Sequence, residues 1–437
     1  MNKYSTLAYE MKRGIINFSE KICAGLSNVK FKFVSCMLYG LLRNQSVKLS
    51  EIARGLEEGI TLKKTIERLS RNLTKFDKRD ELTKNYTNIV KGSVDNDTIF
   101  CLDPGEICKK YSKKQEGLCK VWDASEKKVV NGYKLVEITA LTHKSKLPVP
   151  VYTKLYSSEE EDIEKQSIEN VLALKELDKR FGKIGIRVGD RGMDDVKIYD
   201  YCRGSRYIIR AKINRKVIYN GETMNILDLA NKFKGKIGLK HTDKYGKRHN
   251  LKMWHVKVEL PEVHVTNVND KFTCSSCQSI KDQIFTLIIV HGYDKKDPEP
   301  CLLLTNMDAT GKQKSLRVLK VYLCRWRIEE YYRFKKGQFD LEDIRVLSLN
   351  SIKTLNLLVS MLTGWLSLLA AKKGESLLLD QIFKSARRIY DIPQFTLYAV
   401  ADGIFEILSK TMVGIANFLK YQPQKQWRLT TKSRRIC

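Results

Sequence analysis

The sequence predicts an α/β protein in which a mixed β-sheet is flanked by helices, with helical regions at both ends of the chain. Short runs rich in β-branched and aromatic residues begin at residue 98, and stretches with helical periodicity separate the later ones. Their order is three strands, a helix, a strand, a helix and a strand, which is typical of a mixed sheet. Before residue 97 and after residue 351 the apolar spacing is helical.

The composition indicates a polyanionic partner. The 437 residues include 79 Lys and Arg against 50 Asp and Glu, a formal net charge of +29. The excess is spread along the chain, so we expect double-stranded DNA as the partner and no membrane. The chain opens without the pattern of a secretory signal, and we therefore expect a cytoplasmic protein whose eleven cysteines are thiols.

Residues 1–97 are expected to form a helical DNA-binding domain. Within it, residues 47–73 are typical of two helices in a helix-turn-helix-like arrangement, with Ser50 and Thr61 as N-caps. The second helix would turn Lys63, Lys64 and Arg68 outward, which suits a helix laid along DNA. A plain helical hairpin with a solvated basic face remains an equal alternative.

The catalytic core is expected in two parts, 98–213 and 301–350, with a β-strand insertion subdomain at 214–300. The insertion contains alternating stretches such as LKMWHVKVEL and IFTLIIV. It also holds Cys274 and Cys277 in a CxxC pattern, for which ordinary thiols are favoured over a structural zinc. Residues 351–437 are expected to be helical, and the apolar segment 354–371 is predicted to be a buried core helix rather than a membrane span.

Two acidic residues follow apolar strands. Asp103 comes at the end of TIFCLD and Asp190 at the end of IGIRVGD. Carboxylates at strand ends are placed where sheets of this type bind ligands, although an Asp before Pro or in a turn is also common. Other acids rank lower because they lie off an apolar strand end: Asp194 and Asp195 near the second position, and Asp95 and Asp97 near the first.

A third carboxylate, Glu329, belongs to a predicted amphipathic helix over residues 322–338. At 100° per residue, one face of this helix, called here the stripe, carries Tyr322, Arg325, Glu329, Arg333 and Lys336. A solvated face with an ion pair between Arg325 and Glu329 is the simpler interpretation of such a helix. Glu330 points away from this face and is expected to be solvated or to be a phosphate-screening neighbour.

Three acids on a basic surface suit metal-dependent chemistry on a phosphodiester. Asp103, Asp190 and Glu329 would supply oxygen ligands for two Mg²⁺ ions, with Mn²⁺ expected to substitute. The cations of the stripe would hold the DNA backbone, Tyr322 would donate a hydrogen bond to it, and Trp326 would offer a ring to a base.

The spacing of Tyr322, Arg325, Glu329 and Lys336 resembles the YREK signature of bacterial insertion-sequence DDE transposases of the insertion-sequence-four family. Asp103 and the DRG sequence beginning at Asp190 match that family's first and second acids, and the insertion matches its large β insertion. Pro104 departs from the usual polar or acidic residue after the first Asp. The resemblance covers almost the whole chain.

The resemblance implies a ribonuclease-H-like core and a DNA transposase that binds transposon terminal inverted repeats, cleaves strands and transfers them to target DNA. It implies a homodimer in the synaptic complex, paired by the C-terminal helices, in a bacterial cytoplasm. It also implies that Trp254 or Trp326 receives a flipped base where a hairpin forms. The alternatives are a transposase-derived DNA-binding protein that no longer cuts, and a ribonuclease-H-like nuclease.

Overall fold

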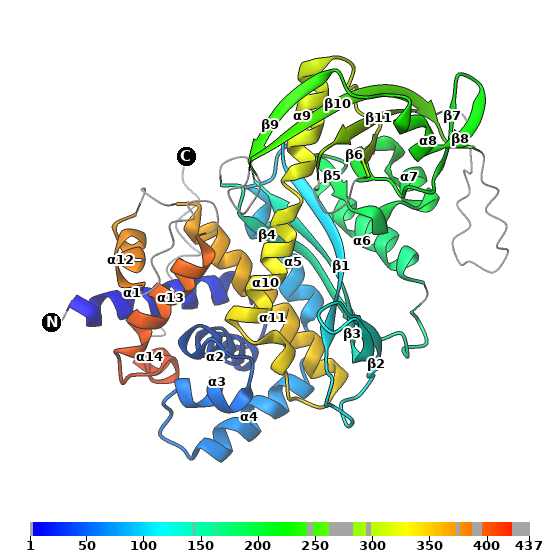
Figure 1. The fold of residues 1–437 in the computed structure, drawn as a ribbon. Coiled ribbons are helices and arrows are strands. Elements are labelled where there is room, and N and C mark those ends of the chain that lie inside the picture. Colours follow the sequence, from blue (N-terminus) through cyan, green and yellow to red (C-terminus); the bar gives the residue numbers. More distant parts are fainter. Residues whose placement is uncertain are drawn as a thin grey trace, which may run out of the picture.

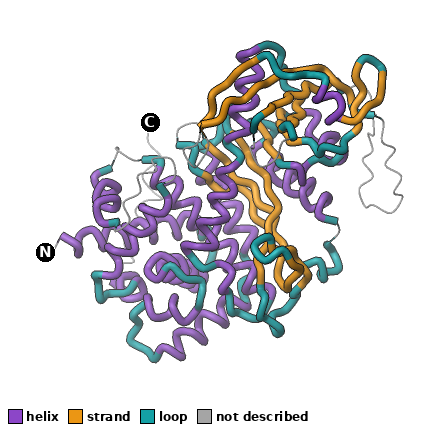
Figure 2. Tube along the Cα trace, viewed as in Figure 1, coloured by secondary structure: helices purple, strands orange, loops and turns teal. Residues whose placement is uncertain are grey.

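The computed structural model describes residues 3–142, 145–163, 165–242, 248–261, 283–293, 299–372, 376–386 and 396–421. Figure 1 shows two regions, an all-helical body that contains both the first and the last helices and a region built on one large β-sheet. Figure 2 shows the same division, with strands confined to the second region. The predicted mixed α/β fold class is confirmed.

The strand pairing at the centre of the sheet is consistent with the ribonuclease-H-like core that the resemblance implies. Strand β1 (Ile99–Cys108) pairs antiparallel with β3 (Lys128–Leu141), and β3 pairs antiparallel with β4 (Pro148–Tyr156). On its other side β1 pairs parallel with β5 (Ile186–Gly189), which pairs parallel with β6 (Arg206–Arg210). The short strand β2 (Cys119–Asp123), which the sequence pattern did not reveal, extends the edge beside β3.

The strands between residues 214 and 305 continue this sheet. Strand β12 (Cys301–Thr305) pairs with β6, β11 (Ile284–His291) with β12, and β10 (Arg248–Glu259) with β11, all antiparallel. Strands β7 (Lys216–Tyr219), β8 (Glu222–Asn225) and β9 (Ile237–Thr242) lie beyond them, and α8 (Ile226–Asn231) follows β8. Cys274 and Cys277 fall outside the described residues.

Helices pack on the sheet. Helix α6 (Gln166–Phe181) contacts β3 and β4, and α7 (Val196–Tyr201) follows β5. Helices α9 (Lys312–Leu323) and α10 (Trp326–Gln338) run along the sheet toward the helical body (Figure 1). Helix α10 contacts both β1 and β4 and thereby joins the sheet to the helical body.

The helical body combines the two ends of the chain. Its N-terminal members α1 (Lys3–Ile22) and α2 (Asn28–Asn44) pack against the C-terminal helix α13 (Leu397–Ser409). The other helices of the body are α3 (Leu49–Gly55), α4 (Leu62–Thr74), α5 (Arg79–Lys91), α11 (Leu349–Ala370), α12 (Leu377–Ser385) and α14 (Ile415–Tyr421). Residues 1–97 and 351–421 thus share one hydrophobic core where they are described.

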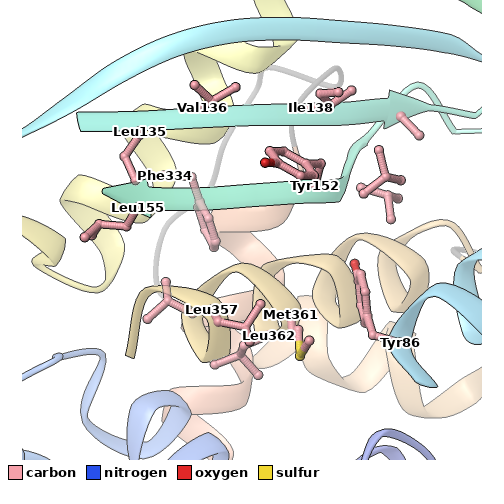
Figure 3. Packing of buried hydrophobic residues seen from close by; sticks show 14 of the residues in the cluster. Tyr86, Leu135, Val136, Ile138, Tyr152, Leu155, Phe334, Leu357, Met361 and Leu362 are labelled. Atoms are coloured by element: carbon pink, nitrogen blue, oxygen red, sulfur yellow. The ribbon is translucent and has the colours of Figure 1, made fainter. Parts of the chain in front are cut away.

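Helix α11 lies at the centre of the interface between the helical body and the sheet. Figure 3 shows Leu357 and Leu362 of α11 close to Phe334 of α10, beneath the strand that carries Leu155. Among the described helices, α11 is long and apolar enough to cross a membrane, but most of it is buried inside the protein. It is the core helix that the sequence predicts.

Candidate active site

Asp103 lies where the parallel ladder between β1 and β5 ends. The last register pair of that ladder is Leu102 with Gly189, directly before Asp103 and Asp190. The expectation that the strand ends at Asp103 is wrong, because β1 continues through Pro104 to Cys108 as the antiparallel partner of β3. A proline fits here because β5 has ended, which leaves that side of β1 without a ladder partner.

Asp190 follows β5 directly and caps a short 3-10 turn. Its Oδ1 accepts a hydrogen bond from the backbone N–H of Gly192 at 2.8 Å. A Cβ on Gly192 would lie 3.0 Å from that oxygen, so the glycine gives the carboxylate room to turn back onto the chain. Since neighbouring strands are about 4.8 Å apart, Asp103 and Asp190 are brought side by side.

The helix that carries Glu329 is not continuous over residues 322–338. Helix α9 ends at Leu323 and α10 begins at Trp326, with i to i+3 hydrogen bonds at Cys324 and Arg325 between them. Tyr322 is therefore not on the exposed stripe. It is 2% exposed and packs in an apolar cluster under the sheet, so its hydroxyl does not face solvent beside Glu329 as expected.

Arg325 joins the acids of the strands and the helix. Its guanidinium lies 2.5 Å from Glu329 Oε1 and 3.8 Å from Asp103 Oδ1. The pKa of Asp103 is raised to about 8, first by burial and then by the nearby charges of Asp190 and Glu329, while Arg325 opposes them. The three carboxylates that the sequence singled out thus lie within electrostatic reach of one another, with Arg325 among them.

Two contacts that sequence reasoning missed hold Asp103 in place. The Tyr332 hydroxyl on α10 donates a hydrogen bond to the backbone carbonyl of Asp103 at 2.7 Å. A Cβ on Gly105 would lie 3.0 Å from the Tyr332 ring, so the absence of a side chain there lets the ring approach β1. The sequence signal for this contact was Gly105, two residues after Asp103. Sequence reasoning took this glycine as part of a turn.

A buried ion pair beside Asp103 was also missed. Lys335 Nζ lies 2.8 Å from Glu137 Oε1, and both side chains are fully buried. The ammonium also donates to Asn356 at 3.0 Å and to Ser360 at 2.9 Å, both on α11. Tyr331 donates to the same carboxylate at 3.2 Å. This network, called here the Lys335 network, fastens α10 to β3 and α11, and burial lowers the pKa of Lys335.

The remaining cations of the stripe lie farther along α10. Lys336 pairs with Glu342 at 2.9 Å and is about one-third exposed. Arg333, more than half exposed, pairs with Glu330 at 2.7 Å, so the expectation that Glu330 is solvated is wrong. The Glu330 side chain is only 11% exposed.

Two tryptophans were proposed as stacking partners for a base. Trp326 is the first residue of α10, and the guanidinium of Arg327 lies 4.4 Å from the centre of the Trp326 ring. Trp254 on β10 stacks on Phe233 at 6.4 Å between ring centres, and Lys236 Nζ lies 5.3 Å from its ring centre. Both rings already have partners, and the structure does not bring Trp254 to the three acids through any described contact.

The lower-ranked acids have other partners. Asp194 is buried, accepts from the Tyr199 hydroxyl at 2.7 Å and pairs with Arg215 at 2.5 Å. Asp195 caps α7. Asp95 closes a turn through Thr98, and Asp97 pairs with Arg317 at 3.1 Å. These contacts are structural, which leaves Asp103 and Asp190 as the acids facing Glu329.

The second helix predicted within residues 47–73 is present as α4. Thr61 caps it by accepting from the backbone N–H of Lys64, whereas Ser50 lies inside α3, whose N-cap is Lys48. Lys63 and Lys64 are exposed, and Arg68 is engaged with Glu58. The helical periodicity that turns these lysines outward would turn Leu62 inward, but Leu62 is 37% exposed.

Asp103, Asp190 and Glu329 have the donor chemistry of a site for hard cations. All three offer carboxylate oxygens, and the buried Asp103 carboxyl, whose pKa is raised to about 8, would be stabilised by a nearby positive charge. Among the described residues, no three acidic, His or Cys side chains already surround one point that could hold an ion. In this arrangement it is Arg325 that supplies positive charge to the cluster.

Comparisons with known proteins give one family and one similar solved structure. The family model for the transposase DDE domain matches residues 108–365, more than half of the chain and a span that contains Asp190 and Glu329 but begins after Asp103. Among solved structures, the chain is similar to a piggyBac transposase synaptic complex with hairpin DNA, at 8% identity and a TM-score of 0.47, covering 98% of this chain and 84% of that one. No curated protein sequence matches significantly.

Proposed function

The chain belongs to the transposase DDE domain family and is a DNA transposase, and we propose that Asp103, Asp190 and Glu329 form its catalytic centre. The observation that supports this most is that Arg325 lies between Asp103 of β1 and Glu329 of α10, while Asp190, directly after β5, is near enough to raise the pKa of Asp103. Acids that served only turns or surface ion pairs would not gather from three separate elements.

We propose that this centre holds two Mg²⁺ ions, or Mn²⁺ in their place, and that the three carboxylates are the ligands. Bound there, the cations would activate the attacking hydroxyl and offset charge on the leaving oxygen. Arg325 then exchanges its carboxylate partners for the phosphates of DNA, because its fork of N–H donors matches phosphate oxygens equally well. Lys336 and Arg333 hold the backbone on either side of the scissile phosphate.

The proposed reaction is strand cleavage at transposon terminal inverted repeats followed by strand transfer to target DNA. Assigned DNA contacts beyond the centre are Trp326, and Lys63, Lys64 and Arg68 on α4. Trp254 is a weaker assignment because its ring is already stacked on Phe233. Two ends must be joined in one event, so a homodimer is the proposed synaptic assembly, in the bacterial cytoplasm near the nucleoid. The insertion-sequence-four assignment belongs to this proposal as well.

The test is Mg²⁺-dependent cleavage of duplex DNA that carries the inverted repeats flanking this coding sequence, with Asp190→Asn as the comparison. The wild-type protein should produce 3′-hydroxyl ends and joined products, and the variant should produce neither while it still binds the repeats. Tight binding without cleavage by the wild type would instead indicate a DNA-binding protein that no longer cuts. Cleavage without joining would indicate a nuclease.

A further inference from the structure

The connection between β1 and β2 presents an unusual group of side chains. Its sequence from Lys109 is Lys-Lys-Tyr-Ser-Lys-Lys. Tyr111 is 94% exposed. Lys113 and Lys114 are exposed and have no acidic partner among the described residues, whereas Lys110 pairs with acids of the next turn. We call residues 109–115 the β1–β2 loop. It offers two free cations and an uncovered aromatic ring.

This loop is held firmly in spite of its exposure. The Gln115 side-chain amide donates to the backbone carbonyls of Ile344 at 3.1 Å and Val346 at 2.8 Å. Lys109, which is 9% exposed, donates to the carbonyls of Glu342 at 2.7 Å and Ile344 at 2.5 Å. The loop is therefore fastened to the segment that follows α10, and a ligand that binds it meets a surface already in position.

The β1–β2 loop lies some distance from the three proposed catalytic acids, and β1 and α10 both lead from those acids toward it. Cys108 is five residues beyond Asp103 on β1, or about 17 Å at the rise of a strand. Lys336 is seven residues beyond Glu329 on α10, or about 10 Å at the rise of a helix. The two elements end at one cavity of about 780 Å³, whose lining includes Cys108, Lys110, Tyr111 and Lys336. Lys336 also acts electrostatically on Glu106 of β1, so the elements remain close along this line.

These distances correspond to about three to five nucleotides, because DNA advances about 3.4 Å per base pair along its axis. We propose that the β1–β2 loop binds DNA at this distance from the scissile phosphate, with Lys113 and Lys114 on backbone phosphates and Tyr111 stacked on a base released from the duplex. Free lysines next to an exposed ring suit a strand with an unpaired base better than a fully paired duplex. The proposal rests on the proposed transposase centre.

The experiment compares Tyr111→Ala, Tyr111→Phe and the double variant Lys113→Ala/Lys114→Ala on two sets of repeat-containing substrates. One set is fully paired. The substrates of the other set carry mismatches three to five nucleotides from the cleaved phosphate, some on its 5′ side and some on its 3′ side. Tyr111→Ala should weaken binding to one of the mismatched substrates about fivefold or more, and Tyr111→Phe should bind like the wild type. Both should bind the paired DNA normally.

The lysine variant should lower the slope of log affinity against log salt by about 1 to 2. Lys179→Ala is the matched control, because Lys179 is 77% exposed on α6, across the sheet from α10 (Figure 1). It should leave the slope unchanged. Unfolding midpoints should not change in any of these variants, since the substituted side chains are exposed.

Equal binding of every substrate by Tyr111→Ala and the wild type would overturn the stacking contact, and an unchanged salt slope in the lysine variant would overturn the phosphate contacts. Wild-type cleavage is measured in the same samples. If the wild type cuts and the loop variants behave like it, the inference about the β1–β2 loop fails while the catalytic proposal stands. If the wild type does not cut, the catalytic proposal itself fails.

Discussion

The Lys335 ammonium lies 2.8 Å from the Glu137 carboxylate, and Glu137 is the β3 register partner of Asp103. A buried ion pair thus lies directly beside the first acid of the proposed centre. Because Lys335 follows Glu329 on α10 by six residues, the same contact sets how α10 lies against β1. We infer that the Lys335 network positions Glu329 relative to Asp103.

Lys335→Met should destabilise the protein strongly, because it leaves Glu137 buried without its counter-charge. Loss of one partner of a buried pair costs on the order of 3–5 kcal/mol. The measurement is the free energy of unfolding in urea. Lys336→Met is the matched control, since Lys336 is partly exposed and pairs with a surface acid. A Lys335→Met protein as stable as this control would contradict the role given to the network.

Asp103→Asn should stabilise the metal-free protein in a pH-dependent manner. The folded pKa of Asp103, about 8, lies above its ordinary value of 3.8. Between these values the unfolded chain is ionised while the folded chain keeps the proton, so the aspartate costs stability as the pH rises through this window. The variant should equal the wild type near pH 4 and exceed it by up to about 5 kcal/mol near pH 8.

Thermal unfolding at both pH values, with and without Mg²⁺, checks this prediction. Added Mg²⁺ should stabilise the wild type and not the Asp103→Asn variant, because the proposed ligand is missing. Asp340→Asn serves as the control, since Asp340 is exposed. Equal pH dependence in all three proteins would show that Asp103 is not confined with the other acids as described.

Arg325→Ala and Lys336→Ala should each weaken binding of the repeats and reduce the salt slope by about 1, because each would remove one phosphate contact. Arg325→Ala should have a second effect that Lys336→Ala lacks. It removes the cation between Asp103 and Glu329 and should therefore lower the stability of the metal-free protein. Salt titrations with both variants measure these slopes. Unchanged slopes and unchanged cleavage in both variants would contradict this assignment.

Lys63→Ala/Lys64→Ala should lower affinity for the repeats without changing the unfolding midpoint, since both side chains are exposed on α4. Electrophoretic mobility shifts measure the affinity. Lys91→Ala, exposed at the end of α5, is the comparison. Normal binding by the double variant would favour the plain helical hairpin over a DNA-binding helix.

The positions of the three acids were accessible from sequence because each depends on local pattern. An apolar run ending in Asp predicts a strand-end carboxylate, and β5 with Asp190 follows that prediction. Helical spacing placed Glu329 near Arg325, and the two are paired in the structure. The length of β1 was not accessible, because Pro104 is a common strand terminator and only the pairing with β3 carries the strand onward.

Features that depend on packing between distant segments were not accessible. Lys335 and Lys336 are identical neighbours in sequence, yet the first is buried against Glu137 and the second is partly exposed. Burial of Tyr322 follows from the turn at residues 324–325, which rotates α9 relative to α10. The continuity of the sheet across residues 206–305 depends on β6 pairing with β12, almost a hundred residues apart in the chain.

The central claim is that Asp103, Asp190 and Glu329 act as one centre, and single-turnover cleavage of repeat-containing DNA tests it most directly. Asp103→Asn, Asp190→Asn and Glu329→Gln should each abolish strand cleavage while affinity for the repeats stays near the wild-type value. Glu330→Gln, one residue away and paired with Arg333, should still cut. Cleavage at the wild-type rate by any of the three acid variants would contradict the claim.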